Sequence, residues 1–177
     1  SVIRHVPIPG LDEVGYITSD EALELRDRPA SMIVLGGGAV ACELAQFYQR
    51  IGVEVTLIQR SHHILSNVDE DLARPVETRL REDGMRVLTG TTLHRFRQQD
   101  GLRVVEFSHE GRDQELSAQV ILQALGRRPN IDSLDLELAN VQVEGQRVLV
   151  DTQMRTSQPH IFAVGDALAS RGWYLDR

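Results

Sequence analysis

Three glycines separate an apolar run from a helix-like pattern between Ser31 and Arg60, in the stretch SMIVLGGGAVACELAQFYQRIGVEVTLIQR. Gly36, Gly38 and Ala41 match the spacing G-x-G-x-x-A. In this pattern the first glycine allows a tight turn, the second lets a pyrophosphate approach the backbone, and the small third residue lets the next helix pack closely. Unpaired N–H groups and the helix dipole favour an anion at the start of that helix. The spacing therefore predicts a dinucleotide site, with a purely structural glycine turn as the alternative.

The residues at the end of the next apolar run indicate which dinucleotide would bind. Sites for NAD place an acid about 20 residues after the glycines, where it holds the ribose 2′-hydroxyl. This chain has the neutral Gln59, followed by Arg60. An arginine can pair with a 2′-phosphate, which an acid would repel. We predict that both residues face the adenosine ribose and that NADPH is preferred to NADH; the alternative is that Arg60 is a solvated charge at a strand end.

The elements around the glycines alternate between strand and helix. In chain order, the segments that predict strand, helix, strand, helix and strand are 32–35, 39–51, 53–58, 69–83 and 85–88. In the first helix one apolar face is expected, formed by Val40, Leu44, Phe47, Tyr48 and Ile51. This order predicts an α/β fold with a Rossmann-like parallel βαβαβ sheet.

The remaining segments predict further short elements. In residues 91–119 apolar and polar residues alternate, and two turns with glycine, Asp100-Gly101 and Glu110-Gly111, interrupt the pattern. This predicts a three-stranded antiparallel meander. More strands are expected at 119–125, 147–150 and 161–164, and a short helix is expected to begin with Thr18 or Ser19 as its cap. Pro75 lies inside the segment 69–83, where it is expected to kink the helix or delay its start.

The composition excludes several functions. A formal net charge of −7 argues against nucleic-acid and anionic-membrane partners. All 19 basic residues are arginines, so lysine-based chemistry is excluded within this chain. The single cysteine, Cys42, allows neither an internal disulfide nor a zinc quartet, and no metal site is expected. No apolar run approaches the roughly 20 residues of a membrane span. We expect a soluble, cytoplasmic protein.

Four stretches, in order along the chain, resemble a known family, the FAD-dependent pyridine nucleotide-disulfide oxidoreductases. They are PIPG with TSDEAL (7–10 and 18–23), VLGGGAVACELAQFY (34–48), ALGRRPN (124–130) and TSQPHIFAVGD (156–166). Within the family the mercuric reductases look most similar, and glutathione reductases and dihydrolipoyl dehydrogenases are also similar. Many family members have a bulky aromatic residue at the position of Ala39, which is a departure from the family pattern.

The resemblance implies cofactor-binding roles for Gly36, Gly38, Ala39, Val40, Glu43, Gln59, Arg60, Gly126 and Asp166. Ala39 and Val40 would help the glycines to cradle the pyrophosphate. Glu43 would approach the nicotinamide side, or it would be an ordinary helix-surface acid. Gly126 would let the backbone pass close to the nucleotide, and Asp166 would bond the ribityl chain of FAD.

The resemblance also implies partners within a longer polypeptide. In that reading residues 1–29 are a linker from an FAD domain, 30–150 are the NAD(P)-binding domain, and 151–177 are a partial return to the FAD domain plus a tail. The implied function is delivery of hydride from NADPH to FAD in a homodimer. No catalytic residue is expected in this stretch, because Cys42 cannot replace the family's cysteine pair. The 177 residues alone are therefore expected to be inactive.

Other functions stay open at this point. An NAD(H)-sensing regulatory Rossmann module would be expected to carry an acid at position 59, where this chain has Gln59. The NADH domain of a ferredoxin reductase or NADH oxidase type of flavoprotein shares the same middle domain. A short-chain dehydrogenase is excluded, because it needs a lysine. The substrate is not indicated, since its contacts would lie in other domains.

Overall fold

The computed structural model describes residues 1–168, so residues 169–177 of the predicted tail lie outside the described part of the chain. The chain divides into two compact units. The larger unit comprises residues 5–126, and the smaller unit joins residues 1–4 to the segment that begins at Arg127. None of the helices within residues 1–168 is both long enough and apolar enough to cross a membrane.

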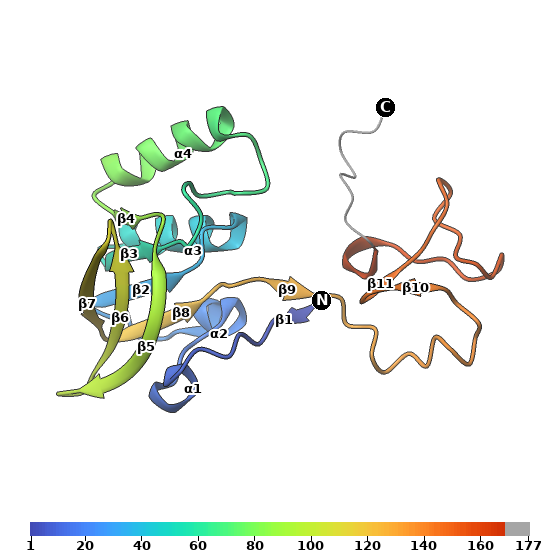
Figure 1. Cartoon of the computed structure of the whole chain (residues 1–177), viewed down its shortest axis with the longest axis horizontal. Helices are drawn as coiled ribbons and strands as arrows, with labels where there is room; N and C mark the ends of the chain where they lie inside the picture. Colours follow the sequence, from blue (N-terminus) through green and yellow to red (C-terminus); the bar gives the residue numbers. More distant parts are fainter. Residues whose placement is uncertain (169–177) are drawn as a thin grey trace. The chain divides into compact units, whose positions relative to one another are not determined.

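A four-stranded parallel sheet forms the centre of the larger unit, with the strand order β4-β3-β2-β8 (Figure 1). Its strands are β2 (Ser31–Leu35), β3 (Glu54–Ile58), β4 (Arg86–Leu88) and β8 (Val120–Gln123). Leu35 at the end of β2 pairs with Ile58 on one side and with Gln123 on the other. Parallel strands are covered on both faces, so they consist of short, continuous apolar runs such as these. The predicted α/β fold is therefore confirmed.

Two helices connect parallel strands, α3 (Ala39–Arg50) between β2 and β3 and α4 (Glu70–Glu82) between β3 and β4, and they pack with α2 (Ser19–Glu24) on one face of the sheet. The short helix α1 (Leu11–Val14) lies on the other face, where Leu11 packs with Ile33 of β2. Thr18 caps α2 in a capping box with Glu21, which confirms one of the two predicted caps. Of the two alternatives predicted for Pro75, a delayed start of α4 is wrong, because the helix begins at Glu70 and contains this proline, whereas a kink stays a prediction. A proline there removes one backbone hydrogen bond, which the rest of the helix tolerates.

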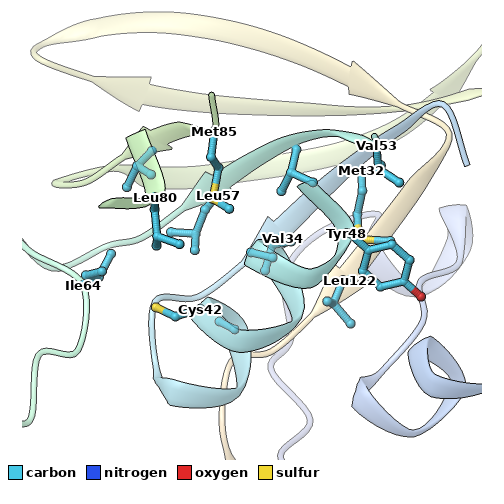
Figure 2. Packing of buried hydrophobic residues seen from close by; sticks show 14 of the residues in the cluster. Met32, Val34, Cys42, Tyr48, Val53, Leu57, Ile64, Leu80, Met85 and Leu122 are labelled. Atoms are coloured by element: carbon cyan, nitrogen blue, oxygen red, sulfur yellow. The ribbon is translucent and has the colours of Figure 1, made fainter. Parts of the chain in front are cut away.

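The buried face of α3 differs from the predicted one. Ala41, Cys42, Ala45 and Tyr48 are buried against the sheet, as Figure 2 shows for Cys42 and Tyr48. Val40, Phe47 and Ile51 are instead exposed, with Phe47 at 52%. Periodicity favours large apolar side chains, whereas a helix that packs closely on a sheet needs small ones at the contact. Of the five residues of the predicted face, Tyr48 is buried and Leu44 is partly buried against the same core, whereas the other three are exposed.

An antiparallel meander covers the opposite face of the sheet, as the sequence predicted. Its strands are β5 (Thr92–Gln99), β6 (Leu102–His109) and β7 (Arg112–Ala118). Both predicted turns have positive φ at their two central residues, for example 51° at Asp100 and 78° at Gly101. Phe96 and Phe107 of the meander pack against Ile33 in β2. Met32 and Val34 of the same strand face the helices, so β2 contributes to two cores.

The smaller unit consists of short pieces around a small core. Its elements are β1 (Val2–Ile3), β9 (Arg127–Arg128), β10 (Val143–Glu144), β11 (Arg147–Val148) and the 3₁₀ helix η1 (Gly165–Ala167). Strand β1 pairs with β9, and β10 pairs with β11, both antiparallel. The predicted strand at 161–164 is wrong, because only a single bridge joins Phe162 to Arg155. Phe162 and Val164 are exposed while Ile161 and Ala163 are partly buried against the core of this unit, so the segment alternates as a strand would but pairs only at Phe162.

Candidate functional site

The glycine turn lies where the order of the parallel strands reverses. The chain leaves β2 for β3 on one side of the sheet and later returns to β8 on the other side. In open α/β sheets, ligands bind at such a point, outside the carboxyl ends of the strands. The N–H of Gly36 donates to the carbonyl of Ile58 at 2.8 Å, and the N–H of Ala124 donates to the carbonyl of Leu35 at 2.9 Å. These bonds hold the exits of the three strands together.

The three glycines of the turn have different surroundings. Gly36 has a φ of +108°, and a Cβ there would lie 2.5 Å from the carbonyl oxygen of Ala124. A Cβ on Gly37 would lie 3.0 Å from Cγ of Gln59. Gly38 has an ordinary φ of −75°, and a Cβ there would meet no atom within 4 Å. The first two glycines therefore serve the packing of the turn, whereas Gly38 borders open space.

The start of α3 borders the same open space and lacks a cap. Gly38 is the N-cap residue and offers no side-chain acceptor to the first N–H groups of the helix, those of Ala39, Val40 and Ala41. These groups have no acceptor within the helix. The first turn of α3 also carries no acid, whereas α1, α2 and α4 each carry two. An anion would meet the positive end of the helix dipole there, so a pyrophosphate fits this end of α3.

The carbonyl of Gly37 is held from the inner side of the turn. It accepts a hydrogen bond from the N–H of Leu65 at 2.6 Å and from Sγ of Cys42 at 3.7 Å. Burial, together with the carboxylates of Glu43 and Glu77, raises the pKa of the Cys42 thiol to about 11. The thiol is therefore protonated at neutral pH and acts as a donor to the turn. The loop that contains Leu65 follows β3, so the segment after Arg60 is tied to the glycine turn.

Gln59 and Arg60 lie at the end of β3, next to the turn. The main chain of Gln59 is fixed by its N–H, which donates to Leu88 at 2.8 Å, and by its carbonyl, which accepts from the N–H and Oγ1 of Thr91 at 3.1 and 2.9 Å. Thr91 is 2% exposed. The side chain of Arg60 is exposed, and none of the acids within residues 1–168 forms an ion pair with it. Its charge is available to a ligand.

The larger unit brings eight of the nine sequence-predicted site residues together around one edge of the sheet. Besides the turn and the end of β3, these include Gly126, which follows β8 with a φ of +118° and open space at its Cβ position. Glu43 is exposed in the second turn of α3. Asp166 belongs to the smaller unit, where it lies in η1 with a side chain that is 71% exposed. Their binding roles stay predictions.

Sequence reasoning missed three residues that hold the turn, namely Gly37, Leu65 and Thr91. Gly37 is the variable position of G-x-G-x-x-A, so the motif assigns it no role, although the side chain of Gln59 lies against it. Leu65 has a φ of +50°, which no residue-type rule for leucine would suggest. Thr91 follows β4 and is joined to Gln59 only through the fold. Nothing in the spacing of residues points to these contacts.

A hollow of about 490 Å³ lies on the outer face of the meander. His94, Glu106, Asp113 and Glu115 line it with two neighbouring residues, and none of them belongs to the glycine turn. Two of its acids are paired with arginines, Glu106 with Arg95 at 2.7 Å and Glu115 with Arg97 at 2.8 Å. The part of the chain that the structure describes contains no group of three or more His, Cys, Asp or Glu residues able to hold a metal ion.

Comparison with known proteins gives consistent matches. The profile of the family described as "Pyridine nucleotide-disulphide oxidoreductase" matches residues 1–174. Mercuric reductase from Staphylococcus aureus is 36% identical over 160 residues, which are 90% of this chain and 29% of that protein. Dihydrolipoyl dehydrogenase from Bacillus subtilis (strain 168) is 34% identical over 163 residues, which are 92% of this chain and 35% of that protein.

The fold has similar solved structures as well. The HOCl-induced flavoprotein disulfide reductase RclA from Escherichia coli, in its Cu(II) complex, superposes with a TM-score of 0.82 at 28% identity. The match covers 94% of this chain and 37% of RclA. The chain thus spans 29% and 35% of the length of the two curated relatives and a similar share of this structure.

Proposed function

Because the chain belongs to the pyridine nucleotide-disulphide oxidoreductase family, we propose that it is the NAD(P)H-binding part of a flavoprotein that passes hydride from NADPH to FAD. When bound, NADPH supplies the hydride and the flavin accepts it. The observation that carries the proposal is the open space at Gly38 beside the uncapped start of α3. That space can take a pyrophosphate, which the backbone N–H groups would bind.

Each residue around the turn has a part in this proposal. Gly36 makes the turn, and Gly38 gives the phosphates access to the backbone. Ala39 and Val40 donate their backbone N–H groups. Gly126, at the exit of β8, leaves room for the nucleotide to pass close to the chain. Glu43 lies one turn further along α3, and we assign it to the nicotinamide side of the site.

The preference for NADPH is part of the same proposal. Arg60 carries a charge that no acid among the described residues neutralises, and Gln59 replaces the acid that would hold a 2′-hydroxyl. A guanidinium forms a charge-assisted pair with a phosphate. A carboxylate at position 59 would oppose that pair by charge repulsion. Both residues support binding of a 2′-phosphate.

The other parts of the enzyme are assigned to the rest of the same polypeptide. We propose a cytoplasmic homodimer with separate FAD and dimerisation domains, in which Asp166 contacts FAD. In it, residues 1–29 form the linker, 30–150 the NAD(P)-binding domain, and 151–177 part of the FAD domain and a tail. Relatives of similar identity are named mercuric reductase and dihydrolipoyl dehydrogenase, so a thiol- or disulfide-linked acceptor is the class of substrate that we propose.

Calorimetric titration of the purified chain with NADPH and NADH tests the site. We expect NADPH to bind about tenfold more tightly, since a hydrogen bond to a charged group contributes about 1.5 kcal/mol or more. Arg60→Gln should remove this difference and leave NADH binding unchanged. Arg112→Gln, at an exposed arginine of the meander, is the matched control and should change neither affinity. Equal binding of the two nucleotides by the parent chain would contradict the NADPH preference.

A second variant tests the position of the pyrophosphate. Gly38→Ala places a methyl group in the open space at the start of α3 without backbone strain, because φ is −75°. We expect its melting temperature to stay at the parent value while both nucleotides bind at least tenfold more weakly. A variant that binds both nucleotides as tightly as the parent would place the site elsewhere.

A further inference from the structure

The peptide bond between Gly37 and Gly38 lies at the boundary between the core and the open space at the start of α3. Gly37 is buried, whereas Gly38 is exposed, and a Cβ on Gly38 would meet no atom of residues 1–168 within 4 Å. This peptide bond is trans, so its carbonyl and its N–H point in opposite directions. Any contact that fixes the carbonyl of Gly37 therefore also fixes the direction of the N–H of Gly38.

Two donors hold that carbonyl on the side of the core. One is the N–H of Leu65 at 2.6 Å, from the loop after β3, and the other is Sγ of Cys42 at 3.7 Å. Cys42 belongs to the buried face of α3 (Figure 2), and its thiol is protonated at neutral pH because burial, with the neighbouring carboxylates, raises its pKa to about 11. The carbonyl of Gly37 is therefore directed into the core.

The N–H of Gly38 then points to the open side of the turn. Among residues 1–168 no acceptor bonds to it. The backbone N–H groups of Ala39 and Val40 follow it in the chain and lack acceptors within the helix. Successive backbone N–H groups that border one open space can bind the oxygens of a phosphate together.

We propose that Cys42 is a positioning residue, whose thiol, together with the N–H of Leu65, orients the Gly37–Gly38 peptide so that the N–H of Gly38 donates to the diphosphate of the dinucleotide. The inference rests on the proposed function. The thiol contacts no ligand and takes part in no redox step, since it acts only through the peptide. NADPH and NADH share the diphosphate, so Cys42 should contribute equally to the binding of both, unlike Arg60.

The alternative is that Cys42 only fills space in the core. Three variants separate the two roles. Cys42→Ala removes the donor, and Cys42→Ser keeps a donor in its place. The matched control is Val53→Ala, because Val53 is 1% exposed in the same core but comes directly before β3, at the end of the strand remote from the turn (Figure 2). A role in packing alone predicts that Cys42→Ala, like this control, lowers stability without changing nucleotide affinity.

Calorimetry of the whole 177-residue chain tests the inference with NADPH, NADH, inorganic pyrophosphate and adenosine 2′-phosphate. For Cys42→Ala we expect the first three ligands to bind about threefold more weakly, by one common factor, with adenosine 2′-phosphate unchanged because it has no diphosphate. Cys42→Ser should stay within about twofold of the parent chain for all four. Val53→Ala should bind all four as the parent does, although its melting temperature falls.

The S–H stretching band in the infrared spectrum gives a second readout that packing alone would not change. Cys42 is the single cysteine of the chain, so the band arises from this group only. A hydrogen bond lowers the stretching frequency of its donor. We expect the band of the parent chain below the frequency of a free thiol in an apolar solvent. A band at the free-thiol frequency would show that the thiol does not hold the carbonyl, and it would overturn the inference.

Two results of the calorimetry would also overturn the inference and leave the proposed function in place. In the first, Cys42→Ala binds NADPH, NADH and pyrophosphate as tightly as the parent chain. In the second, Cys42→Ser loses as much affinity as Cys42→Ala, which assigns the loss to packing rather than to the donor. A parent chain that binds neither dinucleotide would instead contradict the proposed function itself, and the role of Cys42 would be lost with it.

Discussion

At the scale of single residues, the glycine turn combines two different requirements. Gly36 is needed because its backbone lies in the left-handed region and against the carbonyl of Ala124. Gly38 has ordinary backbone angles and no neighbour at its Cβ position. The fold therefore explains the first glycine but not the second. We propose that a ligand that needs the space accounts for the second.

This distinction predicts unequal effects on stability. Gly36→Ala should lower the free energy of unfolding by about 2 kcal/mol or more, because it adds left-handed strain to a clash with backbone. Gly38→Ala should stay within about 0.5 kcal/mol of the parent chain, as substitutions without strain or lost packing usually do. Urea denaturation of the three proteins measures both values. Equal destabilisation by the two substitutions would show that both glycines serve the fold.

The sequence allowed the turn to be predicted but not the contacts that hold it in place. The G-x-G-x-x-A spacing fixes the relation between neighbouring residues, so Gly36 and Gly38 could be located directly. The contact between Gly37 and Gln59 joins two strand ends, and it exists only because β2 and β3 lie in register. A contact of this kind depends on the fold, and residue types alone do not indicate it.

At the scale of elements, strand and helix positions followed from the sequence better than helix faces did. The apolar runs are continuous and short, which is typical of buried parallel strands. In α3, small residues such as Ala41 and Ala45 form the contact with the sheet, while the larger Phe47 is exposed. Large apolar residues therefore predicted only part of the buried face, namely Leu44 and Tyr48. Close packing rather than hydrophobicity determined which face is buried.

The end of α4 is joined to α3 through a carboxylate. Asp83, the C-cap residue of α4, accepts hydrogen bonds from Gln46 and Arg50 of α3, each at 3.0 Å. Arg79 of α4 forms an ion pair with the same carboxylate at 2.5 Å. The Asp83 side chain is only 7% exposed. Burial by itself would raise the pKa of Asp83, but these hydrogen bonds outweigh it and hold the pKa below its ordinary value of 3.8.

The lowered pKa of Asp83 predicts a pH dependence of stability. The ionised carboxylate stabilises the folded state above the unfolded-state pKa of about 3.8, and this contribution is lost as the pH falls through the lower folded-state pKa. Asp83→Asn should therefore be less stable than the parent chain near pH 7, and the difference should shrink below about pH 3.8. Urea denaturation across this pH range measures the difference. A difference that does not change with pH would contradict this role of the charge.

At the scale of the whole molecule, the larger unit contains both cores that surround the sheet. Part of the predicted linker is packed into these cores, since Leu11 and Ala22 are buried. Prolines and turns made this segment look like a connection, and only the structure shows the contacts of its two short helices. How residues 1–29 connect to an FAD domain stays a prediction.

The chain by itself should bind NADPH without oxidising it. We expect no oxidation of NADPH when the chain is mixed with FAD and a disulfide acceptor, as followed by the absorbance of the reduced nicotinamide. A dithiol needs two cysteines, whereas Cys42 is the single cysteine of this chain. It is buried, and burial raises the pKa of its thiol to about 11. NADPH oxidation that disappears in Gly38→Ala would contradict this expectation, because it would originate from the proposed site.

The uncapped N-terminus of α3 belongs to a chain with a formal net charge of −7. If a polyanionic nucleotide binds there, as we propose, the net charge would repel it during its approach, and it would gain the attraction of the helix end and of Arg60 only within the last few ångströms. Added salt should screen the repulsion and speed up the encounter, while it weakens the ion pair in the complex. The rate of capture and the lifetime of the complex would then respond to ionic strength in opposite directions.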